Sequence, residues 1–336
     1  MKILITTGIY PPAIGGPSQY AKQIASALEL LGHRCQVKTY GWMKNLPTGL
    51  RHVAFFLKIL PAMASADFVI SLDTFSVGLP TVLVGKLFKK KVIIRTGGDF
   101  LWEGYVERTG KKVLLRHFYE NERVNLNRKE RTIFALTKWT LNYSALVVFS
   151  TEWQREIWRE PYQLDLNRTS IIENYYGPVE PTAFEGKKKI FVGFTRALKW
   201  KNIDTLKRAF TVARGKTKDI ILDVEPTTYE VGQEKIKSCY GVILLSLGDI
   251  SPNLILDAIR FGKPFIVTEE NGLLPRIGQL GITVDPLNEQ AIAQKIDMLI
   301  DPTIYGTYRQ RLVQFTFTHS WEEIAKEFLT CYRTIL

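Results

Sequence analysis

Short, continuous runs of β-branched and other apolar residues recur along the chain, with helical patterns between them. Phe68–Leu72 (FVISL), Lys91–Arg95 (KVIIR) and Ala145–Ser150 (ALVVFS) are three such runs. A strand that is apolar at every position is covered on both faces, as strands are in the parallel sheet of an α/β protein. Strands that alternate with helices therefore predict a doubly wound parallel sheet.

The pattern runs through both halves of the chain and predicts two such sheets. The further strands expected in the first half are Lys2–Thr6, Arg34–Tyr40 and Arg168–Ile172. Those expected in the second half are Lys189–Gly193, Ile220–Val224, Gly241–Leu245, Pro264–Thr268 and Gly281–Val284. The clearest helical patterns are Ser18–Leu31, Leu79–Leu87, Asp204–Ala213 and the amphipathic Trp321–Thr334.

A segment rich in turn-forming residues separates the two halves. Residues 174–186 (NYYGPVEPTAFEG) contain two prolines and two glycines and have no helical period. A length of 336 residues favours two domains of roughly 150 residues each. We therefore expect a first domain at 1–176, a linker at 177–188, a second domain at 189–318 and a final helix at 319–336.

Composition excludes some classes of protein and leaves others open. No apolar run is long enough to span a bilayer, and the first residues lack the regions of a signal peptide. Three cysteines provide no disulfide framework, which favours a reducing cytoplasm. The net charge of +12 fits a solvated basic surface, an anionic membrane or acceptor, or nucleic acid, although no nucleic-acid-binding signature accompanies it.

Ligands of open parallel sheets bind at the carboxyl ends of the strands, so the loops after the strands are the candidate sites. The loop after the first strand contains Gly15-Gly16, which allows close backbone approach, and Ser18 is a candidate N-cap of the following helix. Such a helix start attracts an anion. The alternative is a tight turn without a ligand. No G-x-G occurs in the chain, so the dinucleotide-binding fingerprint is absent.

Two loops of the second domain carry charged side chains. Arg196 and Lys201 follow the strand at 189–193 and could bind phosphate, although solvation is the common fate of such cations. In the later segment, Ser251 and Pro252 predict the N-cap and first residue of a helix that ends at Gly262. Asp249 precedes that helix, where its dipole alone would favour a carboxylate. Asp257 interrupts the apolar run at 254–259.

These segments together resemble the group 1, family 4 retaining glycosyltransferases of GT-B fold. The matching features are Tyr10-Pro11-Pro12 with Gly15-Gly16, the loop from Arg196 to Lys201, the segment that ends in FGKP, and the closing Ser320-Trp321-Glu322-Glu323. Asp249 and Asp257 have the spacing of the family's E-x7-E motif. The resemblance covers nearly the whole chain. It implies two Rossmann-like domains that face each other across a cleft, and a final helix that crosses back to the first domain.

The resemblance also implies a role for each matching residue. The donor diphosphate of a UDP- or GDP-linked sugar would be held by Arg196 and Lys201 and by backbone amides, which belong to Gly15, Gly16, Ser251, Asn253 and Leu254, with Pro252 starting the helix. Asp257 would bind the ribose, and Asp249 would contact the transferred sugar. Transfer would be of hexosyltransferase type, with retention and without a metal or other cofactor. The acceptor would be a glycan, lipid-linked sugar or polysaccharide, as in polysaccharide biosynthesis.

The sequence departs from the family pattern at three positions. Aspartates replace both glutamates of the motif, and Gly98 stands where the family has a histidine before Asp99, the remaining candidate catalytic residue. A catalytically weakened nucleotide-sugar binder and a sugar-nucleotide epimerase of the same fold are therefore the alternatives. A nucleic-acid binder is the least favoured alternative.

Two basic, apolar stretches could contact a membrane. They are residues 51–60 (RHVAFFLKIL) and 123–143, and basic amphipathic helices of this kind can lie on anionic lipid. The alternative is that both helices simply pack on the first sheet. We expect a cytoplasmic protein and leave open a peripheral position on the inner face of the membrane.

Overall fold

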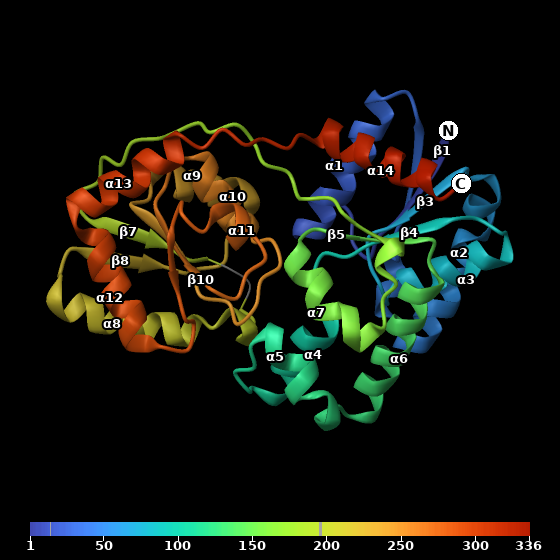
Figure 1. The fold of residues 1–336 in the computed structure, drawn as a ribbon, viewed down its shortest axis with the longest axis horizontal. Helices are drawn as coiled ribbons and strands as arrows, with labels where there is room; N and C mark the ends of the chain where they lie inside the picture. Colours follow the sequence, from blue (N-terminus) through green and yellow to red (C-terminus); the bar gives the residue numbers. More distant parts are fainter. Residues whose placement is uncertain (14, 195–196) are drawn as a thin grey trace. The chain divides into compact units, whose positions relative to one another are not determined.

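The computed structural model describes residues 1–13, 15–194 and 197–336, and it contains two parallel sheets (Figure 1). The first sheet has six strands in the order β2-β1-β3-β4-β5-β6. Its strands are β1 (Lys2–Thr6), β2 (Arg34–Lys38), β3 (Phe68–Ser71), β4 (Val92–Arg95), β5 (Leu146–Phe149) and β6 (Thr169–Ile171). All neighbours in this sheet pair in parallel.

The second sheet has five parallel strands in the order β11-β10-β9-β7-β8. Its strands are β7 (Lys189–Val192), β8 (Ile220–Asp223), β9 (Gly241–Leu244), β10 (Phe265–Thr268) and β11 (Ile282–Val284). Every strand predicted from the sequence is present, with ends that differ from the prediction by at most two residues. The prediction of two doubly wound α/β domains is confirmed.

The helices around the first sheet follow from its strand order. The crossover from β1 to β2 runs in the opposite direction along the sheet to the later crossovers, so right-handed connections place its helix on the opposite face. Accordingly, α1 (Gly16–Leu30) packs with α14 (Trp321–Thr334). In contrast, α2 (Thr48–Ser65), α3 (Gly78–Leu87), α6 (Arg128–Tyr143) and α7 (Glu152–Tyr162) pack one against the next.

The second sheet is covered by the same rule. The crossover helix α8 (Ile203–Lys216) packs on α12 (Glu289–Ile300), and α9 (Tyr229–Ser238) packs on α10 (Asn253–Arg260). The remaining helices are α11 (Leu274–Ile277) and α13 (Pro302–Val313). Among the helices that the structure describes, none is long and apolar enough to cross a bilayer.

Contacts between residues divide the chain into two units that are not continuous in sequence. The first unit consists of Met1–Leu101, Asn125–Tyr175 and His319–Leu336, and the second of Trp102–Val124 and Tyr176–Thr318. The final helix α14 thus belongs to the first unit. The segment with α4 (Phe100–Thr109) and α5 (Leu115–Asn121) packs largely with the second unit, although it lies within the predicted first domain at 1–176.

Two helix starts differ from the sequence prediction. The N-cap of α1 is Gly15, with φ 147°, and Ser18 is a buried residue of the first turn. The prediction of Ser18 as the N-cap is therefore wrong. Helix α10 has Pro252 as its N-cap and begins at Asn253, one residue later than predicted from Ser251 and Pro252. Its end is as predicted, since Gly262 adopts φ +60° directly after the C-cap residue Phe261.

Candidate functional site

An ion pair at the carboxyl edge of the second sheet joins two of the predicted site residues. Lys201 ends the short helix η4 (Lys199–Lys201) after β7, and Asp249 lies in the loop after β9. The Lys201 Nζ and Asp249 Oδ2 atoms are 2.5 Å apart, and each side chain is 13% exposed. Ser246 Oγ also donates to Asp249 Oδ2, at 3.2 Å. The structure thus brings a cation and a carboxylate together where a ligand of this sheet would bind.

Backbone hydrogen bonds fix the loops that carry this pair. The Leu247 amide donates to the carbonyl oxygen of Trp200 at 2.8 Å, which ties the loop after β9 to the loop after β7. The Asp249 amide donates to the carbonyl oxygen of Glu270 at 2.8 Å, which ties it to the loop after β10. The position of the ion pair is therefore set by three strand ends, and not by flexible side chains alone.

The Lys201 ammonium also lies over an aromatic ring, which packs against a second one. The ammonium lies 4.1 Å from the ring centroid of Trp200, which is buried. The Trp102 ring, from α4, lies 5.6 Å from that of Trp200. A cation held over an aromatic face is stabilised electrostatically, and here the rings also limit where the ammonium can move.

Glu270, a buried residue whose carbonyl oxygen accepts from the Asp249 amide, is not among the residues predicted from the sequence. It follows β10 and forms an ion pair with Arg116 of α5, with Nε and Oε1 2.7 Å apart. Burial raises the pKa of Glu270, and the charge of Arg116 opposes this shift. The rule that sites follow strand ends could have found Glu270. Arg116 carried no such signal, because it is distant in sequence from every strand of the second sheet.

Helix α10 and the two residues before it, Ser251 and Pro252, form a further group of predicted donor-binding residues. The first amides of the helix, at Asn253 and Leu254, belong to the turn where helix N–H groups lack intrahelical partners. Asp257 lies one turn further along, is partly buried, and is hydrogen-bonded to the Gln233 side chain of α9. Burial raises the pKa of Asp257 to about 6. Arg196, the other predicted phosphate ligand, lies outside the described residues.

The predicted residues of the first unit lie at the carboxyl edge of the first sheet. Gly15 caps α1 in a backbone conformation that favours glycine, and Gly16 is the first residue of that helix. Asp99 follows β4 and is almost completely buried. Its Oδ2 atom accepts a hydrogen bond of 2.7 Å from the Trp158 indole of α7. In the conformation described, the Asp99 carboxylate therefore interacts with the protein interior.

The residues that the structure describes offer no metal site. They contain no group of three or more His, Cys, Asp and Glu side chains that could hold an ion. The candidate residues of the second unit are the Lys201–Asp249 pair, the first residues of α10 and Asp257. Those of the first unit are Gly15, Gly16 and Asp99.

Comparison with known proteins shows the fold. Sucrose-phosphate synthase from Thermosynechococcus elongatus is similar with a TM-score of 0.74 and 15% identity, over 99% of this chain and 98% of that chain. Anabaena HepE in complex with UDP and glucose is similar with a TM-score of 0.67 and 13% identity, over 99% and 100%. The chain has the GT-B fold. No family model and no curated protein matches the sequence.

A third similar structure is named as an epimerase and not as a transferase or synthase. It is a Listeria monocytogenes protein assigned as a UDP-N-acetylglucosamine 2-epimerase, with a TM-score of 0.62 and 12% identity, over 99% of this chain and 96% of that chain. Because all three identities are low, these similarities establish the GT-B fold of the chain and leave its reaction to be argued from the residues.

Proposed function

We propose that this protein is a retaining, metal-independent glycosyltransferase of the group 1, family 4 type. It transfers a hexose from a UDP- or GDP-linked donor to a glycan, a lipid-linked sugar or a polysaccharide. The observation that carries the proposal is the Lys201–Asp249 ion pair, whose aspartate lies in the loop that leads from β9 into α10, in a chain of GT-B fold.

The ion pair gives a physical basis for donor binding. A diphosphate near the first amides of α10 would compete with Asp249 for the Lys201 ammonium, because it carries more negative charge than one carboxylate. Once Lys201 contacts the diphosphate, the Asp249 carboxylate is available to accept hydrogen bonds from hydroxyl groups of the transferred sugar. Lys201, with Arg196, then stabilises the negative charge that develops on the leaving diphosphate.

Asp257 is the proposed ligand of the ribose hydroxyls. Its carboxylate is on α10, the helix whose N-terminus faces the proposed diphosphate position, and Gln233 holds it in place. An ionised carboxylate accepts hydrogen bonds from two vicinal hydroxyl groups, whereas a protonated one loses part of that capacity. Nucleotide binding therefore depends on Asp257 in this proposal.

Calorimetric titration with UDP, GDP and their hexose conjugates tests the donor site. We expect one nucleotide to bind and Asp257→Ala to weaken its binding about tenfold or more, since a charged hydrogen-bonding partner is lost. The matched control is Asp219→Ala, which removes an exposed carboxylate before β8, at the opposite edge of the same sheet. Binding of no nucleotide by the wild type, or equal effects of the two substitutions, would contradict the proposal.

Two alternative functions, an epimerase and a nucleotide-sugar binder, each have one observation in their favour. The similarity to the Listeria protein favours an epimerase, and the burial of Asp99 with Gly98 in place of a histidine favours a nucleotide-sugar binder. Incubation of the bound nucleotide sugar, first without and then with acceptor, separates the three functions. An epimerase changes the sugar, a transferase releases free nucleotide mainly when acceptor is added, and a binder does neither.

We also propose that the protein works in the cytoplasm, at an anionic membrane surface. All three cysteines are free thiols in the structure, which suits a reducing compartment. The formal charge of +12 favours association with a polyanionic surface that carries the acceptor.

A further inference from the structure

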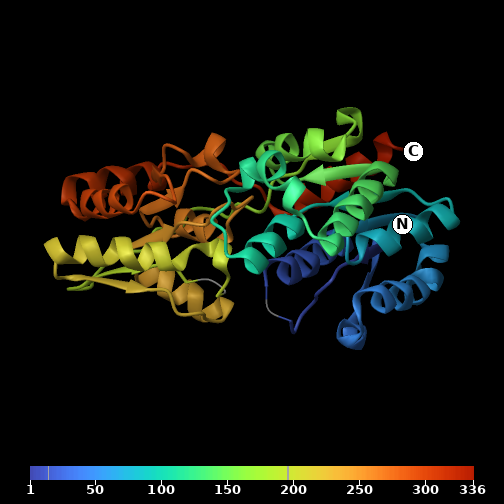
Figure 2. The same cartoon turned by 90° about the horizontal axis from the view of Figure 1, so that it is seen from below.

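Helices α2, α3 and α6 of the first unit are neighbours, and their sequences are rich in basic residues and poor in acidic ones. Helix α2 packs on α3, and α3 packs on α6, so they lie side by side on one face of the first sheet (Figures 1 and 2). We call the outer surface of these helices, with the loop at 88–91 that follows α3, the basic helical face.

The basic helical face carries almost only positive charge. The whole chain has 33 Asp and Glu, yet these segments contain one, Glu130. Glu130 is buried and forms a capping box with Asn127, so it contributes little negative potential to the surface. The same segments contain ten basic residues, which are Arg51, Lys58, Lys86, Lys89, Lys90, Lys91, Arg128, Lys129, Arg131 and Lys138.

Large apolar side chains are exposed on the same face. On α2, Leu50, Val53 and Leu57 are 61%, 58% and 58% exposed, at spacings that place them on one side of the helix. On α3, Leu83 and Leu87 are 40% and 65% exposed, one turn apart. Five exposed apolar side chains on two packed helices, among cations, are the pattern of an interfacial surface.

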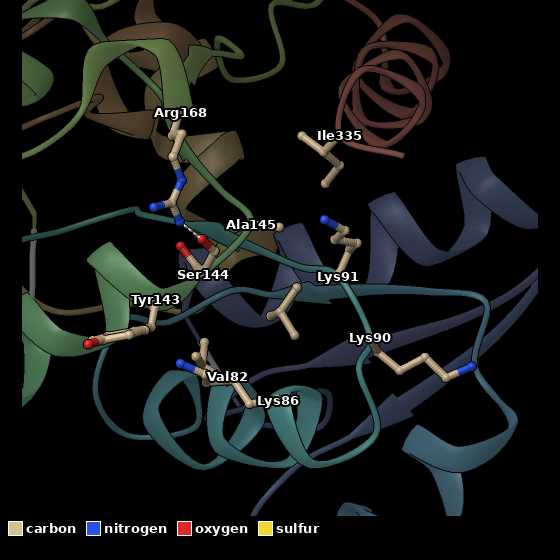
Figure 3. A pocket seen from close by; sticks show the side chains of 10 residues that line it. Val82, Lys86, Lys90, Lys91, Tyr143, Ser144, Ala145, Arg168 and Ile335 are labelled. Carbon is tan, nitrogen blue, oxygen red and sulfur yellow. Dashed lines mark hydrogen bonds between the residues drawn. The ribbon is translucent and has the colours of Figure 1, made fainter.

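A hollow at the end of this face is lined by cations and by no carboxylate. It lies where α3 and α6 end, has a volume of about 370 Å³, and its ten lining residues include no Asp or Glu (Figure 3). The lining residues are Val82, Lys86, Lys90, Lys91, Val92, Tyr143, Ser144, Ala145, Arg168 and Ile335. Four of them are cations, and the aliphatic residues form the apolar part of the wall.

The cationic side chains that line the hollow differ in what they contact. Arg168 donates to the carbonyl oxygens of Asn142 and Ser144, so it serves the end of α6. The Lys86 ammonium lies 3.7 Å from the ring centroid of Tyr143, and Figure 3 shows the Lys91 amine near Ala145 while Lys90 points away. Within the described part of the chain, neither Lys86 nor Lys91 has a carboxylate partner.

We propose that the basic helical face binds an anionic lipid bilayer and that the hollow receives a lipid phosphate. The exposed leucines and Val53 enter the headgroup region, and the basic side chains pair with phosphates. Lys86 and Lys91 supply two of the cations of the hollow, and Tyr143, stacked with Trp139, places an aromatic pair at the interface. The occupant is a lipid surface because a soluble anion would leave the adjoining apolar side chains exposed.

Vesicle flotation tests this proposal independently of sugar transfer. Wild-type protein is mixed with vesicles of equal parts phosphatidylglycerol and phosphatidylcholine, or of phosphatidylcholine alone, at low and physiological salt. We expect binding to the anionic vesicles only. Each basic residue near an anionic surface contributes about fivefold to the partition coefficient, so the double variant Lys86→Glu/Lys91→Glu should lose at least about 25-fold.

The matched control is the double variant Lys207→Glu/Lys218→Glu. It makes the same change in net charge at exposed lysines of the second unit, so it separates the basic helical face from general electrostatic attraction. A third variant, Leu83→Ser/Leu87→Ser, keeps the charge and should lose most of the binding that remains at physiological salt, because the apolar contribution is not screened.

Three outcomes would overturn the proposal. They are failure of the wild type to float with anionic vesicles at low salt, equal losses in the two charge-reversal variants, and binding of pyrophosphate without any binding of vesicles. The last outcome would assign the hollow to a soluble phosphorylated ligand. Nucleotide titration and thermal melting of each variant show whether the donor site and fold are intact, so a failed transferase proposal remains distinguishable.

Discussion

Burial raises the pKa of Asp257 to about 6, and the ionised residue therefore carries a folding cost at neutral pH. The Gln233 side chain and the charge of Arg260 oppose the shift, but desolvation on α10 is the larger effect. In the described structure Asp257 forms no ion pair that would offset the loss of folding stability caused by its ionised carboxylate. A carboxylate of this kind is expected at a ligand-binding position.

This cost gives a pH-dependent prediction for Asp257→Asn. An acid whose folded-state pKa is raised destabilises the fold where it is ionised, above about pH 6, and not below its unfolded pKa near 4. The variant should therefore raise the free energy of unfolding of the second unit by roughly 1–3 kcal/mol at pH 8. The difference should disappear at pH 4. Urea unfolding of both proteins across this range measures it.

The reference for this experiment is Asp219→Asn, an exposed carboxylate whose substitution should leave stability unchanged at both pH values. A destabilised Asp257→Asn variant at pH 8 would mean that the ionised carboxylate contributes to the fold, and the ligand-binding interpretation would lose its energetic support.

A strand end indicates which single residues are candidates for a site, but it does not indicate what their side chains contact. Lys201 and Asp249 were chosen from separate loops, and the structure places them in contact. Asp99 was chosen in the same way, but its carboxylate lies in the interior against Trp158. The direction of a side chain depends on the helices that pack over the loop, and α7 is distant from Asp99 in sequence.

At the scale of elements, helix α6 has a start that its sequence specifies fully. The Asn127 side chain accepts from the Glu130 amide at 2.9 Å, and the Glu130 carboxylate accepts from the Asn127 amide at 2.8 Å. Both hydrogen bonds satisfy amides that would otherwise lack a partner at the helix end. Because α6 is part of the basic helical face, this capping box also holds its only carboxylate away from the surface.

Asn127→Ala should therefore lower the free energy of unfolding of the first unit by about 1 kcal/mol. Asn127→Ser, which retains an N-cap oxygen, should restore most of this loss. Chemical denaturation of the three proteins provides the measurement. An unchanged stability in the alanine variant would show that packing of α6 on α3 and α7 fixes the helix without its cap.

Helix starts were less accurately predicted where glycine or proline replaces a capping side chain. At α1 the chain uses the positive φ of Gly15, and the Ser18 side chain, which has the typical N-cap chemistry, is buried within the first turn. At α10 the N-cap is Pro252, which offers no side-chain acceptor. In both cases the backbone path from the preceding strand determines where the helix begins.

At the scale of the whole molecule, the chain crosses between its units more than once. Helix α14 ends the sequence, yet it packs on α1 in the first unit, with Ile324 and Phe328 completely buried. The Phe328 side chain belongs to a cluster that includes Ile3, Ile24 and Ile93. The last 18 residues therefore complete the core of the first unit.

Phe328→Ala should destabilise the first unit by about 3–5 kcal/mol, since it removes a fully buried aromatic side chain. Differential scanning calorimetry should show the transition of the first unit at a lower temperature and that of the second unit unchanged. Thr330→Ala, at an exposed position of the same helix, should leave both transitions in place. A shift confined to the second unit would contradict the division of the chain by contacts.

The sequence by itself determined the two parallel sheets, their strands and the loops that could bind a ligand. These features follow from local patterns, because apolar runs, turn residues and helical periods act over a few residues. The tertiary structure alone decided that Trp102 and Arg116 belong to the second unit, that Glu270 lies beside Asp249, that Asp99 is buried, and that α2, α3 and α6 share one basic surface. Each of these depends on packing between segments far apart in the chain, which no local pattern encodes.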